Sequence, residues 1–394
     1  MKEYRLGDII TIKHGYAFDG EHIVQEDNGI VLVTPGNFRI GGGFQEEKCK
    51  FYSGEIPDGY VLSSGDFIVT MTDLSKTIDT LGYSALVPES DNRVYLHNQR
   101  IGLVSFKAND CFPGYIYFLM RTHPYQRFIA NTSTGSTVHH TSPSKIYDYR
   151  FYAPSYEEQR EIAERMFAYE KTIKNNQRQI KLLEEAAQRL YKEWFVDLRF
   201  PGHENTKITD GVPKGWRRER LVDLVDVQYG YAFDGSQFNA TRNGMPIIRI
   251  RNIPSGNTCD YTTEKVDVQY VVHNGDILVG MDGEFHINSW SGPDAYLVQR
   301  TCSFRPNKSS MKGYLLQAIY EPIKFFESTV VGATVAHLGK KHIDTISVLT
   351  CPDNLYVPFQ KYYEQRQLLL NQNWLLTEAR DRLLPKLMSG EIEV

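Results

Sequence analysis

Two identical hexapeptides constrain this 394-residue chain more than any other feature of its sequence. The letters GYAFDG stand at Gly15–Gly20 and return at Gly230–Gly235. Similarity over such a distance indicates duplication of a unit of roughly 200 residues rather than a short-period solenoid. Further matches follow in the same order: Leu62–Met71 with Val272–Met281, Gln99-Arg100 with Gln299-Arg300, Thr134–Ile146 with Val331–Ile343, and Gln179–Trp194 with Gln372–Leu387.

The first part of each unit predicts a β-rich domain. About 1–152 and 212–350, short apolar runs are broken by Gly, Asn, Asp and Pro. Such runs predict strands joined by turns. Two stretches with helical apolar spacing, Pro113–Ala130 and Lys312–Thr329, predict helices that are interrupted near an internal proline.

The second part of each unit predicts a long helix. Between Glu157 and about Phe195 there is no Gly or Pro, and apolar residues recur at alternating steps of four and three, as in a coiled-coil seam. The second copy keeps this seam but places Arg366, Asn373 and Arg380 at alternate positions, where polar residues weaken self-pairing and can specify a partner. The residues predicted to pair the helices are Ile173, Ile180, Leu183, Leu190, Leu369, Leu376 and Leu383.

The sequence offers no sign of an active site. Five scattered cysteines without a C-x-x-C pair argue against a disulfide framework and a zinc site. The phosphate loop, the dinucleotide fingerprint, the Asn-Pro-Pro-aromatic tetrapeptide and the metalloprotease motif are all missing. No run of 18 apolar residues and no signal pattern occur, which predicts a cytoplasmic protein. The chain is predicted to be a binding protein with no metal or cofactor of its own.

Two repeated polar loops, GSTVHH and GATVAH, are predicted to contact DNA. Small residues let backbone amides approach phosphates, hydroxyls bond to phosphates or base edges, and lysines neutralise phosphate charge. A tight polar turn between strands is the alternative. The candidate residues are Gly135, Ser136, Thr137, His139, His140 and Lys145 in the first copy, and Gly332, Thr334, His337, Lys340 and Lys341 in the second.

Two arginines alternate with isoleucine in MPIIRIRNIP (Met245–Pro254), which predicts Arg249 and Arg251 on one face of a strand. There they could read guanine or hold phosphate; a salt-bridged surface strand is the alternative. In the first copy Thr34 stands near the place of the first arginine. GYAFDG itself fits a turn better than a binding loop, because Asp before Gly is common turn chemistry. A backbone-amide contact to phosphate is the alternative there.

The order of these features closely resembles the specificity (S) subunits of type I restriction–modification systems. It consists of a β-rich unit with GYAF, a G-[SA]-T-V loop, an Ala-Pro or Cys-Pro step and a long helix, all repeated once. The most specific elements are the helical tails LLEEAAQRLYKEWFVDLRFPG (Leu182–Gly202) and LLTEARDRLLPKLMSGEI (Leu375–Ile392). The resemblance extends over essentially the whole chain.

The resemblance implies an α+β fold with a pseudo-twofold internal repeat. Residues 1–152 and 212–350 would be target-recognition domains, each reading one half of a bipartite double-stranded DNA target. Residues 153–200 and 351–394 would be helical spacers that pair as an antiparallel coiled coil, with a linker at 201–211.

The resemblance also implies a non-catalytic subunit that works with partners. Two methyltransferase (M) subunits would dock on the helices and bring S-adenosylmethionine, and restriction (R) subunits would bring ATP and Mg. A coiled-coil scaffold without sequence-specific DNA contact is the alternative function. Because the net charge is −4, we expect the isolated chain to bind DNA weakly, with the affinity completed by the partners.

Overall fold

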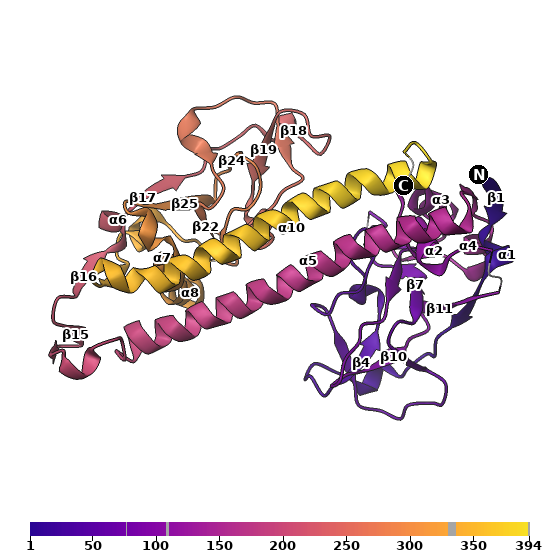
Figure 1. The fold of residues 1–394 in the computed structure, drawn as a ribbon, viewed down its shortest axis with the longest axis horizontal. Coiled ribbons are helices and arrows are strands. Elements are labelled where there is room, and N and C mark those ends of the chain that lie inside the picture. Colours follow the sequence, from indigo (N-terminus) through magenta and orange to yellow (C-terminus); the bar gives the residue numbers. More distant parts are fainter. Residues whose placement is uncertain (76, 108–109, 330–335, 393–394) are drawn as a thin grey trace. The chain divides into compact units, whose positions relative to one another are not determined.

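The computed structural model describes all of the chain except residues 76, 108–109, 330–335 and 393–394 (Figure 1). It divides into two compact units, of which unit 1 comprises Met1–Glu170 with Ala379–Val394, and unit 2 comprises Lys171–Glu378. Each unit holds one β-rich domain and a segment of both long helices, α5 (Tyr156–Tyr191) and α10 (Val357–Ser389).

The domain of unit 1 contains two larger sheets. One has the order β3-β5-β4-β10-β6 with β4 and β10 parallel, and the other has the order β2-β11-β7-β9 with antiparallel pairs only. The first sheet consists of β3 (Ile23–Val24), β5 (Lys50–Tyr52), β4 (Ile30–Val33), β10 (Val94–His97) and β6 (Val61–Leu62). The second consists of β2 (Ile10–His14), β11 (Ile101–Phe106), β7 (Phe67–Thr70) and β9 (Ser84–Leu86).

The domain of unit 2 repeats this topology. Its sheets have the orders β18-β20-β19-β24-β21, with β19 and β24 parallel, and β17-β25-β22-β23. The strands are β18 (Phe238–Asn239), β20 (Tyr261–Thr262), β19 (Met245–Ile248), β24 (Ala295–Leu297), β21 (Val271–Val272), β17 (Val225–Tyr229), β25 (Thr301–Pro306), β22 (Ile277–Gly280) and β23 (Ile287–Ser289). The predicted duplication is therefore confirmed, strand for strand.

Short helices and terminal strands complete each domain. The helix predicted near residue 113 is interrupted, as expected, into α2 (Pro113–Leu119) and α3 (His123–Thr132). Its counterpart forms α7 (Lys312–Ala318) and α8 (Tyr320–Thr329), with Pro322 in the first turn of α8, where no amide hydrogen is needed. The remaining paired strands are β1 (Lys2–Arg5) with β13 (Arg150–Ala153), β8 (Thr72–Asp73) with β12 (His139–His140), β16 (Arg217–Arg220) with β26 (Ser347–Thr350), and β14 (Ile208–Thr209) with β15 (Val212–Pro213).

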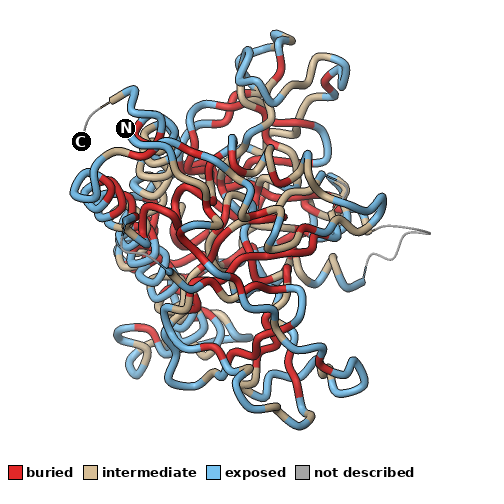
Figure 2. Tube along the Cα trace, turned by 90° about the vertical axis from the view of Figure 1, so that its right-hand side faces the viewer, coloured by how far each residue is buried: buried red, intermediate tan, exposed pale blue. Residues whose placement is uncertain are grey.

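Each unit has its own main core. In unit 1, Leu6, Tyr115 and Phe118 are fully buried together with Met166 of α5 and Leu387 of α10. In unit 2 a matching cluster includes Tyr314, Phe304 and Phe359. Figure 2 shows buried residues concentrated within the domains and exposed residues on the surface loops. No helix among the described residues is long and apolar enough to cross a lipid bilayer.

The two long helices run side by side in opposite directions within unit 2 (Figure 1). Glu184 of α5 pairs with Arg366 of α10 at 2.6 Å, and the amide of Asn176 lies 3.4 Å from that of Gln372. Residue numbers therefore decrease along α10 as they increase along α5, so the two helices are antiparallel. Pairing of the two helices as a coiled coil remains a prediction. The predicted pairing residues are all buried or half-buried: Ile173, Ile180, Leu183, Leu190, Leu369, Leu376 and Leu383.

Candidate nucleic-acid interface

The first glycine of the hexapeptide in unit 1 lets the chain pass against the end of a strand. A Cβ atom on Gly15 would lie 2.2 Å from the carbonyl oxygen of Asn98, just beyond β10. The amide of Tyr16 donates to the carbonyl of His97 at 2.8 Å, and the carbonyl of Tyr16 accepts from the amide of Gln99 at 2.9 Å. The hexapeptide therefore fixes the backbone of the Gln99-Arg100 turn.

Unit 2 has the same arrangement. A Cβ atom on Gly230 would lie 2.1 Å from the carbonyl oxygen of Val298. Tyr231 donates to the carbonyl of Leu297 at 2.9 Å and accepts from the amide of Gln299 at 2.7 Å. The repeated glycine is thus required by a close backbone approach, which occurs once in each domain.

The rest of the hexapeptide is a turn, as predicted. Phe18 and Phe233 are buried. The carboxylates of Asp19 and Asp234 each accept a hydrogen bond from the backbone amide two residues ahead and so cap a short 3-10 helix. A contact of this turn with phosphate remains a prediction.

The carboxyl ends of the parallel strands bring a second segment to the same place. Because β4 and β10 run in register, Thr34 directly after β4 lies beside Asn98 directly after β10. In unit 2, Arg249 follows β19, and the amide of Val298 donates to the carbonyl of Ile248 at 3.1 Å. Thr34 and Arg249 therefore occupy equivalent positions next to the two Gln-Arg turns, as the sequence predicted.

A third segment of unit 1 brings the polar loop to this edge. Met71, which follows β7, donates to the carbonyl of Arg100 at 2.9 Å and accepts from the amide of Thr141 at 3.0 Å. Next to these bonds, Nδ1 of His140 lies 3.2 Å from the hydroxyl of the buried Thr72. The segments that carry the exposed residues Arg100 and His140 are therefore held next to Met71 by backbone hydrogen bonds.

In unit 2 the same frame carries a carboxylate. Met281 donates to the carbonyl of Arg300 at 2.9 Å and accepts from the amide of Leu338 at 2.7 Å. Nδ1 of His337 is hydrogen-bonded to the carboxylate of Asp282, which stands at the place of Thr72. The guanidinium of Arg300 lies 3.3 Å from the same carboxylate. Asp282 therefore orients both neighbouring side chains.

These residues form what we call polar edge 1 and polar edge 2. Polar edge 1 consists of Thr34, Thr72, Gln99, Arg100 and His140, and polar edge 2 consists of Arg249, Asp282, Gln299, Arg300 and His337. Each is flanked by a tyrosine pair, Tyr16 with Tyr60 at 5.3 Å and Tyr231 with Tyr270 at 5.1 Å between ring centroids. Since Tyr16 is 43% exposed, an aromatic face stands open beside polar edge 1.

The predicted loop of unit 1 is a tight and exposed turn. Thr134 and His140 exchange backbone hydrogen bonds of 3.0 and 2.8 Å across it. Gly135 has φ +108°, and a Cβ atom there would lie 2.0 Å from the carbonyl oxygen of Val138, so only glycine fits. Ser136 and Thr137 are exposed at its tip. This loop is therefore a tight turn, and contact of its exposed hydroxyls with DNA remains a prediction.

The other predicted residues of this region are placed less uniformly. Nδ1 of His139 is buried and has no hydrogen-bond partner among the described residues. Lys145 lies half-buried in α4 (Pro143–Tyr147). Lys340 and Lys341 are exposed in α9 (Lys340–Ile343), shortly after His337. Gly332 and Thr334 lie outside the described residues. Among the described residues, no group of three or more His, Cys, Asp or Glu could hold a metal ion.

A buried carboxylate supports the strand beside the loop of unit 1. Asp73 lies in β8 (Thr72–Asp73), which pairs with β12 (His139–His140). Burial acts to raise the pKa of the Asp73 carboxyl, but hydrogen bonds from Ser75 and Thr80 outweigh this effect and lower it. Asp73 is therefore held ionised and fixes the segment next to His139.

The prediction that Arg249 and Arg251 share one face of a strand is wrong. β19 ends at Ile248, and Ile250–Asn252 form a short 3-10 helix, because the side chain of Asn252 accepts from the amide of Arg249 at 2.8 Å. Arg251 is bound instead by both oxygens of Asp260, at 2.5 to 3.2 Å. Only Arg249 lies at polar edge 2.

The sequence alone does not indicate a role for Arg100, Arg300, Thr72 or Asp282. The arginines belong to a Gln-Arg pair that recurs in both copies, and this repetition was the available signal. These arginines are placed near the histidines by backbone hydrogen bonds between segments that are distant in the chain, and no local sequence pattern reveals such bonds.

A buried histidine supports polar edge 1 and makes unit 1 sensitive to acid. His97 is 1% exposed, and its Nε2 donates to the carbonyl of Ile101 at 2.9 Å. Burial lowers the pKa of the His97 imidazole, so below about pH 6.5 the unfolded chain binds a proton that the native state excludes. The free energy of unfolding should therefore decrease as the pH is lowered below about 6.5. This group contributes at most about 1.4 kcal/mol per pH unit to the decrease.

Leucine occupies the equivalent position in unit 2, at Leu297, which suggests His97→Leu as the test. We expect the variant to lose part of the decrease in unit 1 stability between pH 7 and pH 5.5. Urea unfolding of unit 1 can be followed by the exposure of the buried Cys111 to a disulfide reagent that reacts in acid, with Cys302 reporting unit 2. An equal decrease in both proteins would contradict the assignment.

Comparisons with known proteins agree with this architecture. The family described as type I restriction modification DNA specificity domain matches residues 1–185 and 213–354. The Type I restriction enzyme MjaIX specificity subunit of Methanocaldococcus jannaschii is 25% identical over 298 residues, covering 71% of this chain and 69% of that protein. The HindI specificity subunit of Haemophilus influenzae is 21% identical over 384 residues, covering 78% and 83%.

A solved structure has a similar fold. The crystal structure of the type I restriction–modification system S subunit from M. genitalium superimposes with a TM-score of 0.56, covering 98% of this chain and 96% of that chain. At 14% sequence identity this similarity concerns the fold alone.

Proposed function

We propose, since this chain belongs to the family of type I restriction modification DNA specificity domains, that it is the DNA-recognition subunit of a type I restriction–modification complex. The observation that carries the proposal is the presence of two polar edges built on the same backbone frame with different side chains. A protein that reads two unlike half-sites needs this combination of a shared frame and variable contacts.

The side chains of the polar edges suit base recognition. Arginine pairs in a bidentate manner with guanine in the major groove, and a histidine with one ring nitrogen engaged presents the other. Arg100 and His140 would contact the first half-site, and Arg300 and His337 the second. Arg249 replaces Thr34 in the second copy and adds a guanidinium there. The two half-sites should therefore differ in sequence.

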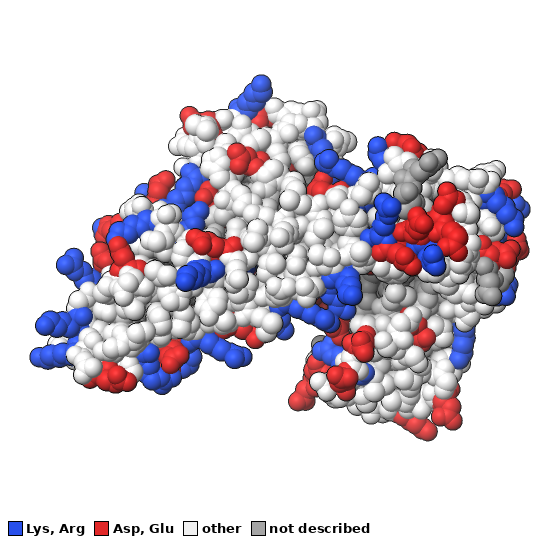
Figure 3. Space-filling view, viewed as in Figure 1, with Lys and Arg blue, Asp and Glu red and all other residues white. Residues whose placement is uncertain are grey.

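Phosphate contacts would come from the neighbouring basic and hydroxyl groups. Lys340 and Lys341 are exposed beside polar edge 2, and Ser136 and Thr137 beside polar edge 1. Lysines and arginines are interspersed with acidic residues on the face seen in Figure 3. With a net charge of −4, the isolated chain should bind DNA weakly and with strong salt dependence.

The helices would carry the partner subunits. Leu182 of α5 and Leu368 and Leu375 of α10 are 64%, 57% and 58% exposed. These exposed leucines would contribute apolar contacts to the docking of another protein. We assign this surface to two methyltransferase subunits, which would supply S-adenosylmethionine, while restriction subunits would supply ATP and Mg. The recognition domains would then be 1–152 and 212–350, with 153–200 and 351–394 as spacers and 201–211 as linker.

The test is to map methylated adenines in the genome of a host that expresses the methyltransferase partner with and without this chain. We expect a split motif that appears only when the chain is present. A stable complex with the partner that produces no motif dependent on this chain would support a scaffold function instead.

A further inference from the structure

A buried arginine joins the domain of unit 2 to both long helices. Arg366 of α10 is 8% exposed. Its Nε donates to the carboxylate of Glu184 on α5 at 2.6 Å. The two terminal nitrogens donate to Ser289 Oγ at 2.7 Å and to Asn288 Oδ1 at 2.6 Å, both in β23. One guanidinium thus holds α5 and the domain together from α10.

The contact continues to polar edge 2. Nδ2 of Asn288 donates to the carbonyls of Ile253 and Pro254 at 2.9 Å each. These two residues directly follow the 3-10 helix that begins after Arg249. A continuous series of hydrogen bonds therefore leads from Glu184 through Arg366 and Asn288 to the turn that carries Arg249.

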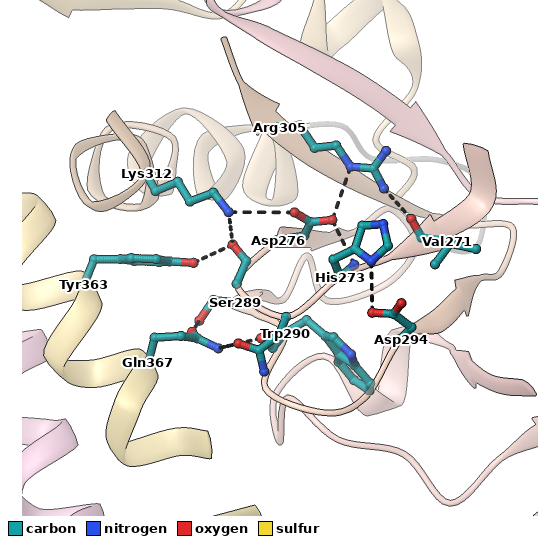
Figure 4. A network of polar contacts seen from close by, with 12 residues as sticks. Val271, His273, Asp276, Ser289, Trp290, Asp294, Arg305, Lys312, Tyr363 and Gln367 are labelled. Carbon is teal, nitrogen blue, oxygen red and sulfur yellow. Dashed lines mark hydrogen bonds and ion pairs between the residues drawn. The ribbon is translucent and has the colours of Figure 1, made fainter. Parts of the chain in front are cut away.

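Neighbouring side chains of α10 reinforce the same attachment (Figure 4). The hydroxyl of Tyr363 donates to the carbonyl of Gly275 at 2.6 Å. Gln367 donates to the carbonyl of Trp290 at 2.7 Å and accepts from the hydroxyl of Ser289 at 2.8 Å. In Figure 4 both side chains point from α10 into the domain. The attachment is polar and directional, unlike a purely apolar contact.

Unit 1 makes the same connection with an arginine from another element. Arg121 lies between α2 and α3, and its side chain is 6% exposed. It forms an ion pair with Glu170 of α5, and its Nε donates to the carbonyl of Gly41 at 2.9 Å. Gly42 has φ +87°, and a Cβ atom there would lie 2.5 Å from Arg121. The loop that contains Gly41 and Gly42 therefore packs closely against the side chain of Arg121.

This loop again follows a residue of the polar edge. Thr34 precedes a short 3-10 helix, Pro35–Asn37, and the glycines come shortly after it. Both units thus connect the turn behind the polar edge to a glutamate of α5 through a buried arginine. The two arginines occupy different elements of the fold, so duplication alone does not explain the shared connection.

We propose that Arg121 and Arg366 are positioning residues, each of which fixes the orientation of its polar edge relative to α5. Replacing a whole buried ion pair by apolar residues is often neutral for stability, whereas removing one partner is destabilising, so we assign to these pairs a role in directional geometry. If the orientation of each edge is fixed, the complex should accept only one separation between the two half-sites. This inference rests on the proposed DNA-recognition function.

The test uses the complex with its methyltransferase partner and DNA targets whose half-sites are constant while the spacer varies by single base pairs. We expect the wild-type complex to methylate one spacer length at least about 10-fold faster than its neighbours, in line with the cost of one mismatched position. Arg366→Met and Arg121→Met should reduce this ratio to below about 3-fold and keep the sequence requirement of both half-sites.

Two further variants separate positioning from folding. Glu184→Gln and Glu170→Gln leave each arginine bound to its domain and weaken its link to α5, so they should relax the spacer preference as well. Glu184→Gln is the more selective of the two, because Glu170 also lies 3.9 Å from the guanidinium of Arg380 on α10. Arg242→Met is the matched control, because Arg242 forms an ion pair with Glu378 of α10 at 2.8 Å but is 51% exposed. An unchanged spacer ratio in the glutamine variants would overturn the inference. Absence of any motif in the wild-type complex would instead reject the proposed function.

Discussion

Alanine at Gly230 is expected to unfold unit 2 at urea concentrations that leave the wild-type protein folded, whereas alanine at Gly235 should have almost no effect. The two glycines open and close the same hexapeptide. A Cβ atom on Gly230 would lie 2.1 Å from a backbone carbonyl oxygen, but a Cβ atom on Gly235 would have no atom within 4 Å.

The size of the effect follows from the backbone hydrogen bonds that are lost and from overpacking at the site. Separating residue 230 from Val298 disrupts the hydrogen bonds that Tyr231 makes with Leu297 and Gln299, at about 1 kcal/mol each. Overpacking a tight site adds about 1–3 kcal/mol. We therefore expect Gly230→Ala to lower the free energy of unfolding of unit 2 by about 3–5 kcal/mol.

Tryptophan fluorescence measures this directly, because all four tryptophans of the chain lie in unit 2: Trp194, Trp216, Trp290 and Trp374. The same comparison in unit 1 uses Gly15→Ala and Gly20→Ala, with exposure of Cys111 as the signal. Equal unfolding midpoints for the alanine variants at the first and last glycine of one hexapeptide would contradict this explanation. The first glycine would then not be required by the close backbone approach.

Removing the guanidinium of Arg300 is expected to relax recognition at one base pair of the second half-site and to leave the first half-site intact. One bidentate contact with a base contributes about 1–3 kcal/mol of discrimination, so methylation of the bipartite target should fall about 10- to 100-fold in Arg300→Ala. Targets altered only at that base pair of the second half-site should then no longer be rejected. Arg100→Ala should produce the same result for the first half-site.

The control is Arg218→Ala, which removes an exposed arginine of β16 in the same unit and changes the net charge equally. It should weaken methylation no more than about 2-fold. A uniform loss across all sequences in Arg300→Ala would mean that Arg300 contacts phosphate rather than a base.

The fold could be predicted from the sequence to the extent that it depends on repetition and periodicity. The duplication, the interrupted helix near residue 113 and the two long helices were all predictable for this reason. Strand ends were not, as Arg251 illustrates. Alternating Ile and Arg predict a strand as far as residue 251, but the side chain of Asn252 caps a 3-10 helix that starts earlier.

The polar edges were harder to predict from the sequence, because they depend on contacts between distant segments. Arg100 and His140 are 40 positions apart in the chain, and Met71 joins Arg100 to Thr141, the residue after His140, through two backbone hydrogen bonds. The seam arginine Arg366 was correctly located on the helix, but its role was not predictable. Its partners Ser289 and Asn288 come from a strand, whereas a heptad pattern describes only contacts between helices.

Unit 1 is built from both ends of the chain, and this affects the order in which the chain folds during synthesis. Leu387 and Met388 of α10 are buried in the core of unit 1, together with residues as early as Leu6. The ribosome makes them only after all of unit 2. The first domain to emerge is thus the last to be completed, and until α10 is made the apolar side chains that pack against Leu387 and Met388 lack these partners.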